Sequence, residues 1–273
     1  MRIQHNIMAM NAYRNYNNNT SALSKNLEKL SSGYKINRAG DDAAGLAISE
    51  KMRAQITGLN KAQDNANDGI SMVQTAEGAL TEVHDMLNRM YELAVQSANG
   101  TYEADDRNKI KDEINQLTKE IDRIADAADF NGKKLFNQAA GVNVTLQIGD
   151  TGDSFNQLTV TFKGMKVAQM TLSTIATAIA SGATSALASI DKAIEYVSSM
   201  RGTLGAVQNR LEHTVNNLSV MEENIQNAES RIRDTDVADE MMAYTKNNIL
   251  IQSAQAMLAQ ANAVPQGVLQ LLQ

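Results

Sequence analysis

Apolar residues recur at steps of three, four and seven along most of this chain, which is the spacing of one face of an α-helix. Between residues 43 and 99 the stripe consists of Met52, Ile56, Leu59, Ala66, Ile70, Val73, Leu80, Val83, Leu87, Met90 and Ala94. Asn99-Gly100 follows and is typical of a helix end. Such a helix is about 85 Å long, whereas a compact globule of this many residues is about 50 Å across. The pattern therefore predicts an elongated rod.

Two further segments show the same helical period. Residues 105–128 carry Ile110, Ile114, Leu117, Ile121 and Ile124. The segment 183–233 carries a seam of Ile190, Ile194, Val197, Leu204, Val207, Leu211, Val215, Leu218, Ile225 and Ile232. The helix over 183–233 is about 75 Å long, which is close to the length of the helix over 43–99. These two long helices are therefore expected to pair antiparallel.

The period changes to two near the middle of the chain. Apolar residues alternate with polar ones over 142–148 and again over 158–162, on either side of the turn sequence Gly149-Asp150-Thr151-Gly152-Asp153. This pattern predicts one β-hairpin at about 142–162. Residues 163–183 are rich in Thr, Ala and Ser and leave helix and loop both open.

The two ends of the chain each carry one narrow apolar stripe. Apolar residues fall at helical spacing in residues 1–30 and again in 236–273, where Pro265-Gln266-Gly267 is expected to interrupt the helix. One stripe is too narrow to repay the entropy of ordering a lone helix. The ends are therefore expected to pair and to be fully buried only when copies of the chain stack. The residues predicted to mediate this polymerisation are Ile3, Ile7, Leu23, Leu27, Leu30, Val237, Met241, Ile251, Leu258, Val268 and Leu271.

Charge supports the pairing of the ends. The first forty residues carry a net +5 and the last forty a net −3. Opposite charges help the ends to find each other, although an exposed ion pair contributes only about 0–1 kcal/mol. Residues 247–273 carry no charged side chain.

Composition excludes several classes of protein. The net charge of −6 argues against a nucleic-acid partner. Cysteine is absent, so no disulfide or Cys-ligated metal is expected. No apolar run has the length of a membrane span, and no cleaved secretory leader is expected. The histidines His5, His84 and His213 lie far apart without ligand spacing, so we expect no catalytic residue, no metal and no cofactor.

Several stretches of this chain resemble the bacterial flagellin family. LSSGYKINRAGDDAAGLAISEKMRAQI at residues 30–56 is very similar to the N-terminal signature of that family. The resemblance continues in ELAVQSANGT (92–101), EIDRIADAADFNGKKLF (120–136), RGTLGAVQNRLEHTVNNL (201–218) and SRIRDTDVADEM (230–241), with a tail that ends in VPQGVLQLLQ. It covers nearly all of 1–140 and 184–273. In this family the middle of the chain often holds large variable outer domains, for which the segment of about 141–183 is too short here.

The resemblance implies a mainly α fold, an elongated antiparallel helical rod or coiled coil with one small β-hairpin and paired N- and C-terminal helices. Residues 1–41 and 235–273 form its inner coiled-coil domain, and 42–234 form the rod. It implies a structural subunit of the extracellular flagellar filament, used for swimming and exported unfolded through the flagellar type III pathway. The partners implied are further copies of the chain, an export chaperone and the export apparatus, and the filament cap and junction proteins.

A host partner, Toll-like receptor 5, is also implied by the resemblance. The motif RMYELAVQS resembles the receptor-contact motif of animal-sensed flagellins, although Asn88 and Tyr91 depart from it. Arg89, Leu93 and Gln96 fall on one helix face at i, i+4 and i+7, and Glu113 on the next helix matches a further contact position. These four residues are expected to form an exposed cluster that binds the receptor. The alternative, compatible with it, is that they pack the next subunit.

Three other classes remain open. A hook–filament junction protein shares the terminal helices of the flagellins but stops at a ring. A membrane-active translocator would fit the uncharged tail, but polar residues interrupt that tail regularly. An enzyme fits least, because no set of polar residues converges in the pattern.

Overall fold

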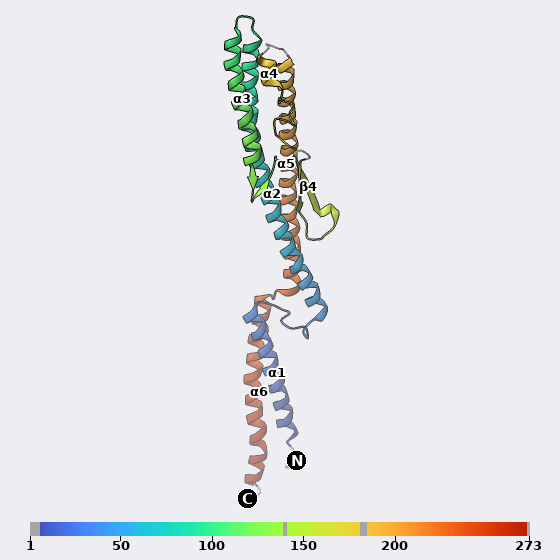
Figure 1. Ribbon diagram of the computed structural model, residues 1–273. Helices are drawn as coiled ribbons and strands as arrows, with labels where there is room; N and C mark the ends of the chain where they lie inside the picture. The colour runs from blue at the N-terminus through green and yellow to red at the C-terminus, as the bar shows by residue number, and fades with distance from the viewer. Residues whose placement is uncertain (1–5, 139–140, 181–184, 272–273) are drawn as a thin grey trace. The chain divides into compact units, whose positions relative to one another are not determined.

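The computed structural model describes residues 6–138, 141–180 and 185–271 (Figure 1). The described residues form six α-helices and two antiparallel strand pairs, so the predicted mainly α class is confirmed. The helices are α1 (Ile7–Ser32), α2 (Ala43–Ala98), α3 (Ala104–Ala127), α4 (Ile175–Ala180), α5 (Ser185–Arg233) and α6 (Val237–Leu271). The strands are β1 (Asp129–Phe130), β2 (Lys133–Lys134), β3 (Val142–Gln147) and β4 (Gln157–Phe162), with a 3-10 turn, Ser154–Asn156, before β4.

The chain divides into two compact units. The first unit consists of Met1–Ile56 and Glu223–Gln273, and the second consists of Thr57–Glu222. The first unit contains α1 and α6, and the second contains α3, α4 and both strand pairs. Helices α2 and α5 contribute residues to both units, since each begins in one and ends in the other.

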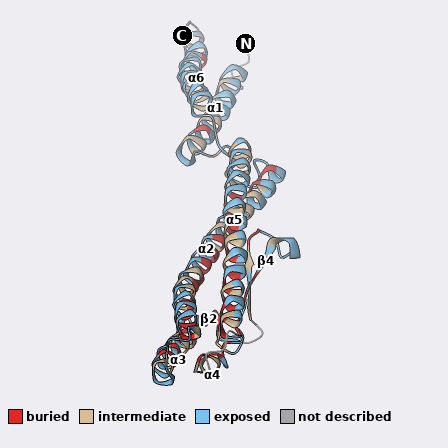
Figure 2. Ribbon diagram, turned by 90° about the horizontal axis from the view of Figure 1, so that it is seen from above, coloured by how far each residue is buried: buried red, intermediate tan, exposed pale blue. Residues whose placement is uncertain are grey.

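The second unit has a continuous apolar core. In α5 the buried positions repeat in steps of three, four and seven, as the sequence predicted: Ala186, Ile190, Ala193, Val197, Met200, Leu204, Leu211 and Leu218. All of these except Leu218 belong to one cluster with the buried stripe of α2, which includes Val73, Leu80 and Val83, and with the isoleucines of α3. The buried positions of these helices appear as red patches in Figure 2. Removing this apolar area from water is what stabilises the unit.

The predicted hairpin forms and packs on α2. Strands β3 and β4 pair from Val142↔Phe162 to Gln147↔Gln157. Asn65 of α2 donates to the carbonyl of Gln147 at 3.0 Å. A Cβ at Gly69 would lie 2.4 Å from a methyl of Leu146. Glycine at that position therefore allows the hairpin to approach the helix, at a cost of about 1 kcal/mol of helix stability.

One short strand pair was not expected, and one expectation needs correction. Strands β1 and β2 pair across a turn at Asn131 and Gly132, whose φ angles are 50° and 77°. Positive φ at both central residues matches the right-handed twist of a short hairpin. Helix α6 runs unbroken from Val237 to Leu271, so the interruption expected at Pro265 is wrong. One proline removes a single backbone donor, which costs a helix about 3 kcal/mol without ending it.

A small aromatic core lies beside the hairpin, whereas the described part of the segment that the sequence left open, 163–180, forms turns and the short helix α4. Phe136 and Phe162 are fully buried and meet edge to face, with ring centroids 6.2 Å apart. The hydroxyl of Tyr196 donates to the carbonyl of Gly164 at 2.9 Å, and burial raises the pKa of that phenol. The end of the hairpin is thus attached to α5 through a satisfied polar contact.

We expect Phe136→Ala to destabilise the second unit by about 3–5 kcal/mol, because it leaves a cavity in a packed core. Equilibrium urea unfolding followed by circular dichroism measures this loss. The matched control is Phe155→Ala, since Phe155 is 76% exposed and its removal should change stability by less than about 0.5 kcal/mol. Equal effects of the two substitutions would contradict the assignment of Phe136 to the core.

Candidate functional site

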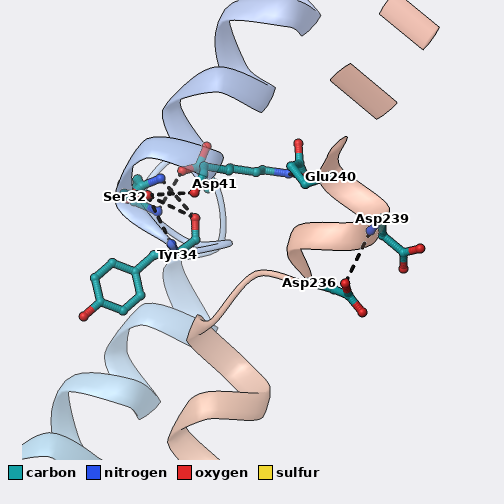
Figure 3. A network of polar contacts seen from close by, with 8 residues as sticks. Ser32, Tyr34, Asp41, Asp236, Asp239 and Glu240 are labelled. Atoms are coloured by element: carbon teal, nitrogen blue, oxygen red, sulfur yellow. Dashed lines mark hydrogen bonds and ion pairs between the residues drawn. The ribbon is translucent and has the colours of Figure 1, made fainter. Parts of the chain in front are cut away.

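The terminal helices α1 and α6 lie side by side in the first unit (Figure 1). Asn6 caps α1, since its side-chain oxygen accepts from the backbone N–H of Ala9 at 3.1 Å. Gly33 ends α1 in the left-handed region at φ 75°. Asp236 caps α6 by accepting from the N–H groups of Ala238 and Asp239, and Figure 3 shows its carboxylate turned toward Asp239. Both helices therefore begin at side-chain caps that the local sequence supplies.

The seam between α1 and α6 mixes small, polar and larger apolar residues. The more buried positions of α1 follow a heptad: Ala9, Ala12, Tyr16, Asn19, Leu23, Asn26 and Leu30. Those of α6 follow the same rule: Tyr244, Asn247, Ile251, Ala254, Leu258 and Ala261. Only Asn26 and Ala261 are below a tenth exposed among the described side chains of the two helices. The pair thus buries little apolar surface on its own.

Most of the large apolar side chains of the two helices lie outside this seam. Twelve of the eighteen exposed large hydrophobic residues in the described part of the chain lie on α1 and α6, each 40–66% exposed. They are Ile7, Met8, Met10, Tyr13, Leu27, Val237, Met241, Met242, Ile249, Leu250, Met257 and Val264. In Figure 2 these two helices are accordingly almost entirely pale blue and tan. An apolar surface of this extent marks an interaction site.

The predicted polymerisation residues divide between the two faces. Leu23, Leu30, Ile251 and Leu258 are half-buried at the seam. Ile7, Leu27, Val237 and Met241 are exposed. Ile3 lies outside the described residues, as do the side chains of Val268 and Leu271. Whether any of the eleven mediates polymerisation stays a prediction.

The sequence pattern missed much of the outward apolar surface. Five exposed residues of this surface lie outside the stripe that the sequence predicted: Met8, Tyr13, Ile249, Leu250 and Met257. A second apolar stripe beside the first was the signal that could have found them. Along the edge of the seam, α1 and α6 also form an open groove of about 390 Å³, lined by Met8, Asn11, Ala12, Asn15, Asn19, Leu250, Ser253, Ala254 and Met257.

Two linkers of the first unit are hydrogen-bonded to each other. Tyr34 and Asp234 form an isolated antiparallel bridge, in which Lys35 N–H donates to the carbonyl of Arg233 at 2.7 Å. The guanidinium of Arg233 lies 4.9 Å from the centre of the Tyr34 ring and donates to Glu50 at 2.6 Å. The bridge and the cation–π contact connect the linker after α1 to the linker before α6.

The loop before α2 contains two aspartates, Asp41 and Asp42, with different roles. Asp42 accepts from the N–H of Gly45 at 2.9 Å and is the cap. Asp41, shown in Figure 3, accepts instead from the N–H groups of Arg38 and Asn37. These backbone hydrogen bonds, with that of Arg38 the larger, hold the pKa of Asp41 below its ordinary value. The loop thereby presents a fixed entry to α2.

The four residues of the predicted receptor cluster are not all exposed. Arg89 pairs with Glu113 of α3 at 3.0 Å and with Glu92 at 3.1 Å, and the hydrogen bond to Glu92 and then that to Glu113 raise the pKa of the guanidinium. Gln96 is exposed and donates to the Tyr102 hydroxyl at 2.9 Å. Leu93 is only 2% exposed and lies in the core of the second unit, so its expected exposure is wrong.

The reason for this error is the width of the buried stripe on α2. Positions 90, 93, 94 and 97 are all buried, so the face that carries Leu93 turns inward. Tyr91 and Val95 are 41% and 49% exposed, but at i+2 and i+6 from Arg89 they lie on another side of the helix. Receptor binding by the surface around Arg89 stays a prediction.

The described part of the chain contains neither a metal-ligand cluster nor a helix that could cross a membrane. Within 6–138, 141–180 and 185–271, no three acidic or histidine side chains gather as a metal site. None of the helices in those ranges combines the length and hydropathy that crossing a bilayer requires.

Comparison with known proteins identifies the family. The model of the bacterial flagellin N-terminal helical region matches residues 3–140, and that of the C-terminal helical region matches 187–272. A flagellin of Halalkalibacterium halodurans is 53% identical over 279 aligned residues, and a flagellin of Bacillus subtilis is 50% identical over 305. The flagellar filament 33 kDa core protein of Treponema phagedenis is 49% identical over 285.

Each of these three alignments covers the whole of both chains. The resemblance found in the sequence is therefore confirmed over its full length. The chain belongs to the bacterial flagellin family, whose members are structural proteins of the flagellar filament and not enzymes.

Proposed function

We propose that copies of this chain polymerise into an extracellular flagellar filament by burying the outward apolar faces of α1 and α6 between neighbours. The observation that carries this proposal is the set of twelve large apolar side chains left exposed on the two helices. Full burial of one such side chain contributes about 1.5–3 kcal/mol. Several of them together offset the entropy of ordering a subunit, which the alanine- and asparagine-rich seam alone does not.

Swimming motility and passage through the flagellar type III pathway follow from the same proposal. A terminal helix pair that buries few side chains unfolds at low cost, which suits a chain that must be threaded through an export channel. An export chaperone that covers the apolar faces of α1 and α6 would keep unassembled copies apart. The export apparatus, the filament cap and the junction proteins are the further partners that this route requires.

We also propose that Toll-like receptor 5 binds the surface formed by Arg89, Gln96 and Glu113. Support comes from the resemblance of RMYELAVQS to the receptor-contact motif and from the geometry of the surface. Arg89 and Glu113 bring α2 and α3 together and leave both charged groups about half exposed. Leu93 lies in the core beneath this surface and fixes the position of this turn of α2.

We expect the amides of α1 and α6 to exchange rapidly in dilute monomer and slowly in the filament. The physical reason is that only neighbouring copies exclude water from these helices. Hydrogen exchange read by mass spectrometry measures both states, and peptides around Leu80, which is fully buried, serve as the protected internal control. Strong protection of both terminal helices in the monomer would contradict the proposal.

We expect Leu250→Ser with Met257→Ser to raise the critical concentration for seeded growth roughly tenfold or more, since each change removes apolar burial in the filament. Light scattering and negative-stain microscopy measure growth. Gln252→Ser with Gln255→Ser is the matched control on exposed polar positions of α6 and should stay within about twofold. Wild-type chain that stops at rings would instead identify a hook–filament junction protein.

We expect Arg89→Ala with Glu113→Ala to weaken binding to the receptor ectodomain at least about tenfold, because truncated charged anchors are costly at an interface. Surface plasmon resonance measures the affinity. Glu120→Ala with Arg123→Ala removes another exposed ion pair, on α3 alone, and should leave affinity unchanged. Unchanged affinity of the first variant would reject the receptor surface, and seeded growth of the same variant would show whether the residues pack a neighbouring subunit.

A further inference from the structure

We propose that Asn26 selects the register in which α1 pairs with α6. Asn26 is the only described polar side chain of these two helices that is buried to about nine-tenths, at 9% exposed. It lies at a seam position of the heptad, where apolar residues are the rule. A buried polar residue at such a position specifies pairing at some cost in stability. This role concerns the fold of one chain and is separate from polymerisation.

The observed register is antiparallel and is defined by contacts at both ends of the pair. At one end, the side-chain amide of Asn6 donates to the carbonyl of Ala261 at 2.7 Å. At the other end, Lys29 lies 3.6 Å from Glu240, and Figure 3 shows Glu240 pointing toward α1. This alignment sets Ala9 opposite Ala261 and Asn26 opposite Tyr244.

Asn26 is saturated with partners in this register. With its amide oriented to match its neighbours, the nitrogen donates to Glu240 Oε1 at 2.9 Å and to the carbonyl of Ala22 at 3.1 Å. The oxygen accepts from the side-chain amide of Asn247 at 3.0 Å and from the backbone N–H of Tyr244 at 3.3 Å. Three of the four bonds reach across to α6, so they report the position of one helix against the other.

Apolar packing at the far end of the pair does not distinguish the alternatives. A slip of one heptad would replace Ala9 opposite Ala261 by Ala9 opposite Ala254. It would also replace Leu258 by Ile251 opposite Ala12, with almost the same volume. Such exchanges are tolerated by helix seams. The choice of register must therefore be made where the seam is polar.

A slip in either direction disrupts the layer around Asn26. One direction sets Asn26 opposite Val237 and the other sets it opposite Ile251. Each direction removes at least one of its two side-chain partners on α6 and separates Lys29 from Glu240. A buried polar group left without its partners disfavours that state more than a lost surface contact does. Asn26 therefore favours the observed register by destabilising the slipped ones.

Cysteine crosslinking tests this directly, because the natural chain contains no cysteine. Ala9→Cys with Ala261→Cys reports the observed register, and Ala9→Cys with Ala254→Cys reports the slipped one. Seven residues shift a helix by about 10 Å, beyond the reach of a disulfide, so each pair is specific. Intramolecular products migrate as monomers on denaturing gels and intermolecular ones as dimers. Both pairs are read in the full-length soluble chain and in seeded filaments, so a failure to assemble does not prevent the measurement.

In the natural background we expect the 9–261 crosslink alone. Asn26→Leu should raise the ratio of slipped to observed product about tenfold, or reduce the 9–261 product if the helices slip the other way. Asn19→Leu is the matched control, since Asn19 is a half-buried asparagine of the same seam, and it should keep the 9–261 product. An unchanged pattern in Asn26→Leu would show that the linkers alone set the register and would overturn the proposal. An equal shift in Asn19→Leu would overturn it too.

Discussion

The structure depends on a helix pair that leaves most of its large apolar residues outside its own seam. Ala9, Ala12, Ala254 and Ala261 lie along the α1–α6 seam, whereas Met8, Met10 and Met257 face outward. Burial of a small side chain removes little apolar area, so such a pair gains little by closing on itself. Its apolar surface becomes useful only against another surface. In a subunit built this way, most of the burial of large apolar side chains takes place in contacts with neighbouring copies.

The second unit follows the opposite rule. Its heptad positions carry Leu, Ile, Val and Met, and the aromatic pair of Phe136 and Phe162 closes one part of the core. This unit satisfies its own apolar surface and provides a stable base in the same chain. Its exposed surface includes ion pairs such as that of Arg89 with Glu113. Division of labour between units thus arises from where the large apolar residues fall in the heptad, since the helical period is the same in both.

Much of this could be predicted from the sequence, because the helical and strand periods are long and regular. The bounds of the long α2 helix and the hairpin residues 142–162 followed from spacing and turn signals alone. The inward turn of Leu93 could not be predicted, since i and i+4 spacing puts two residues on one face without saying how wide the buried face is. The same ambiguity divided the polymerisation stripe, with Leu23 at the seam and Leu27 exposed. Pro265 misled for a different reason, because propensity is a local rule and a helix can continue past one missing donor.

Charge explains the pairing of the ends less well than hydrogen bonding does. The opposite net charges of the two ends suggested a series of ion pairs between them, yet among the described residues of α1 and α6 only Lys29 and Glu240 form one. Another basic side chain near the N-terminus pairs on its own side of the seam: Arg38 lies 2.9 Å from Glu28. An attraction between net charges has no fine spatial period, so it brings helices together without choosing among heptad registers. Directional bonds at a buried asparagine do have that period. A seam in which alanine and asparagine alternate with the larger apolar residues is therefore poor in stability and rich in specificity, which is the combination that a subunit needs when its neighbours must supply the rest of its core.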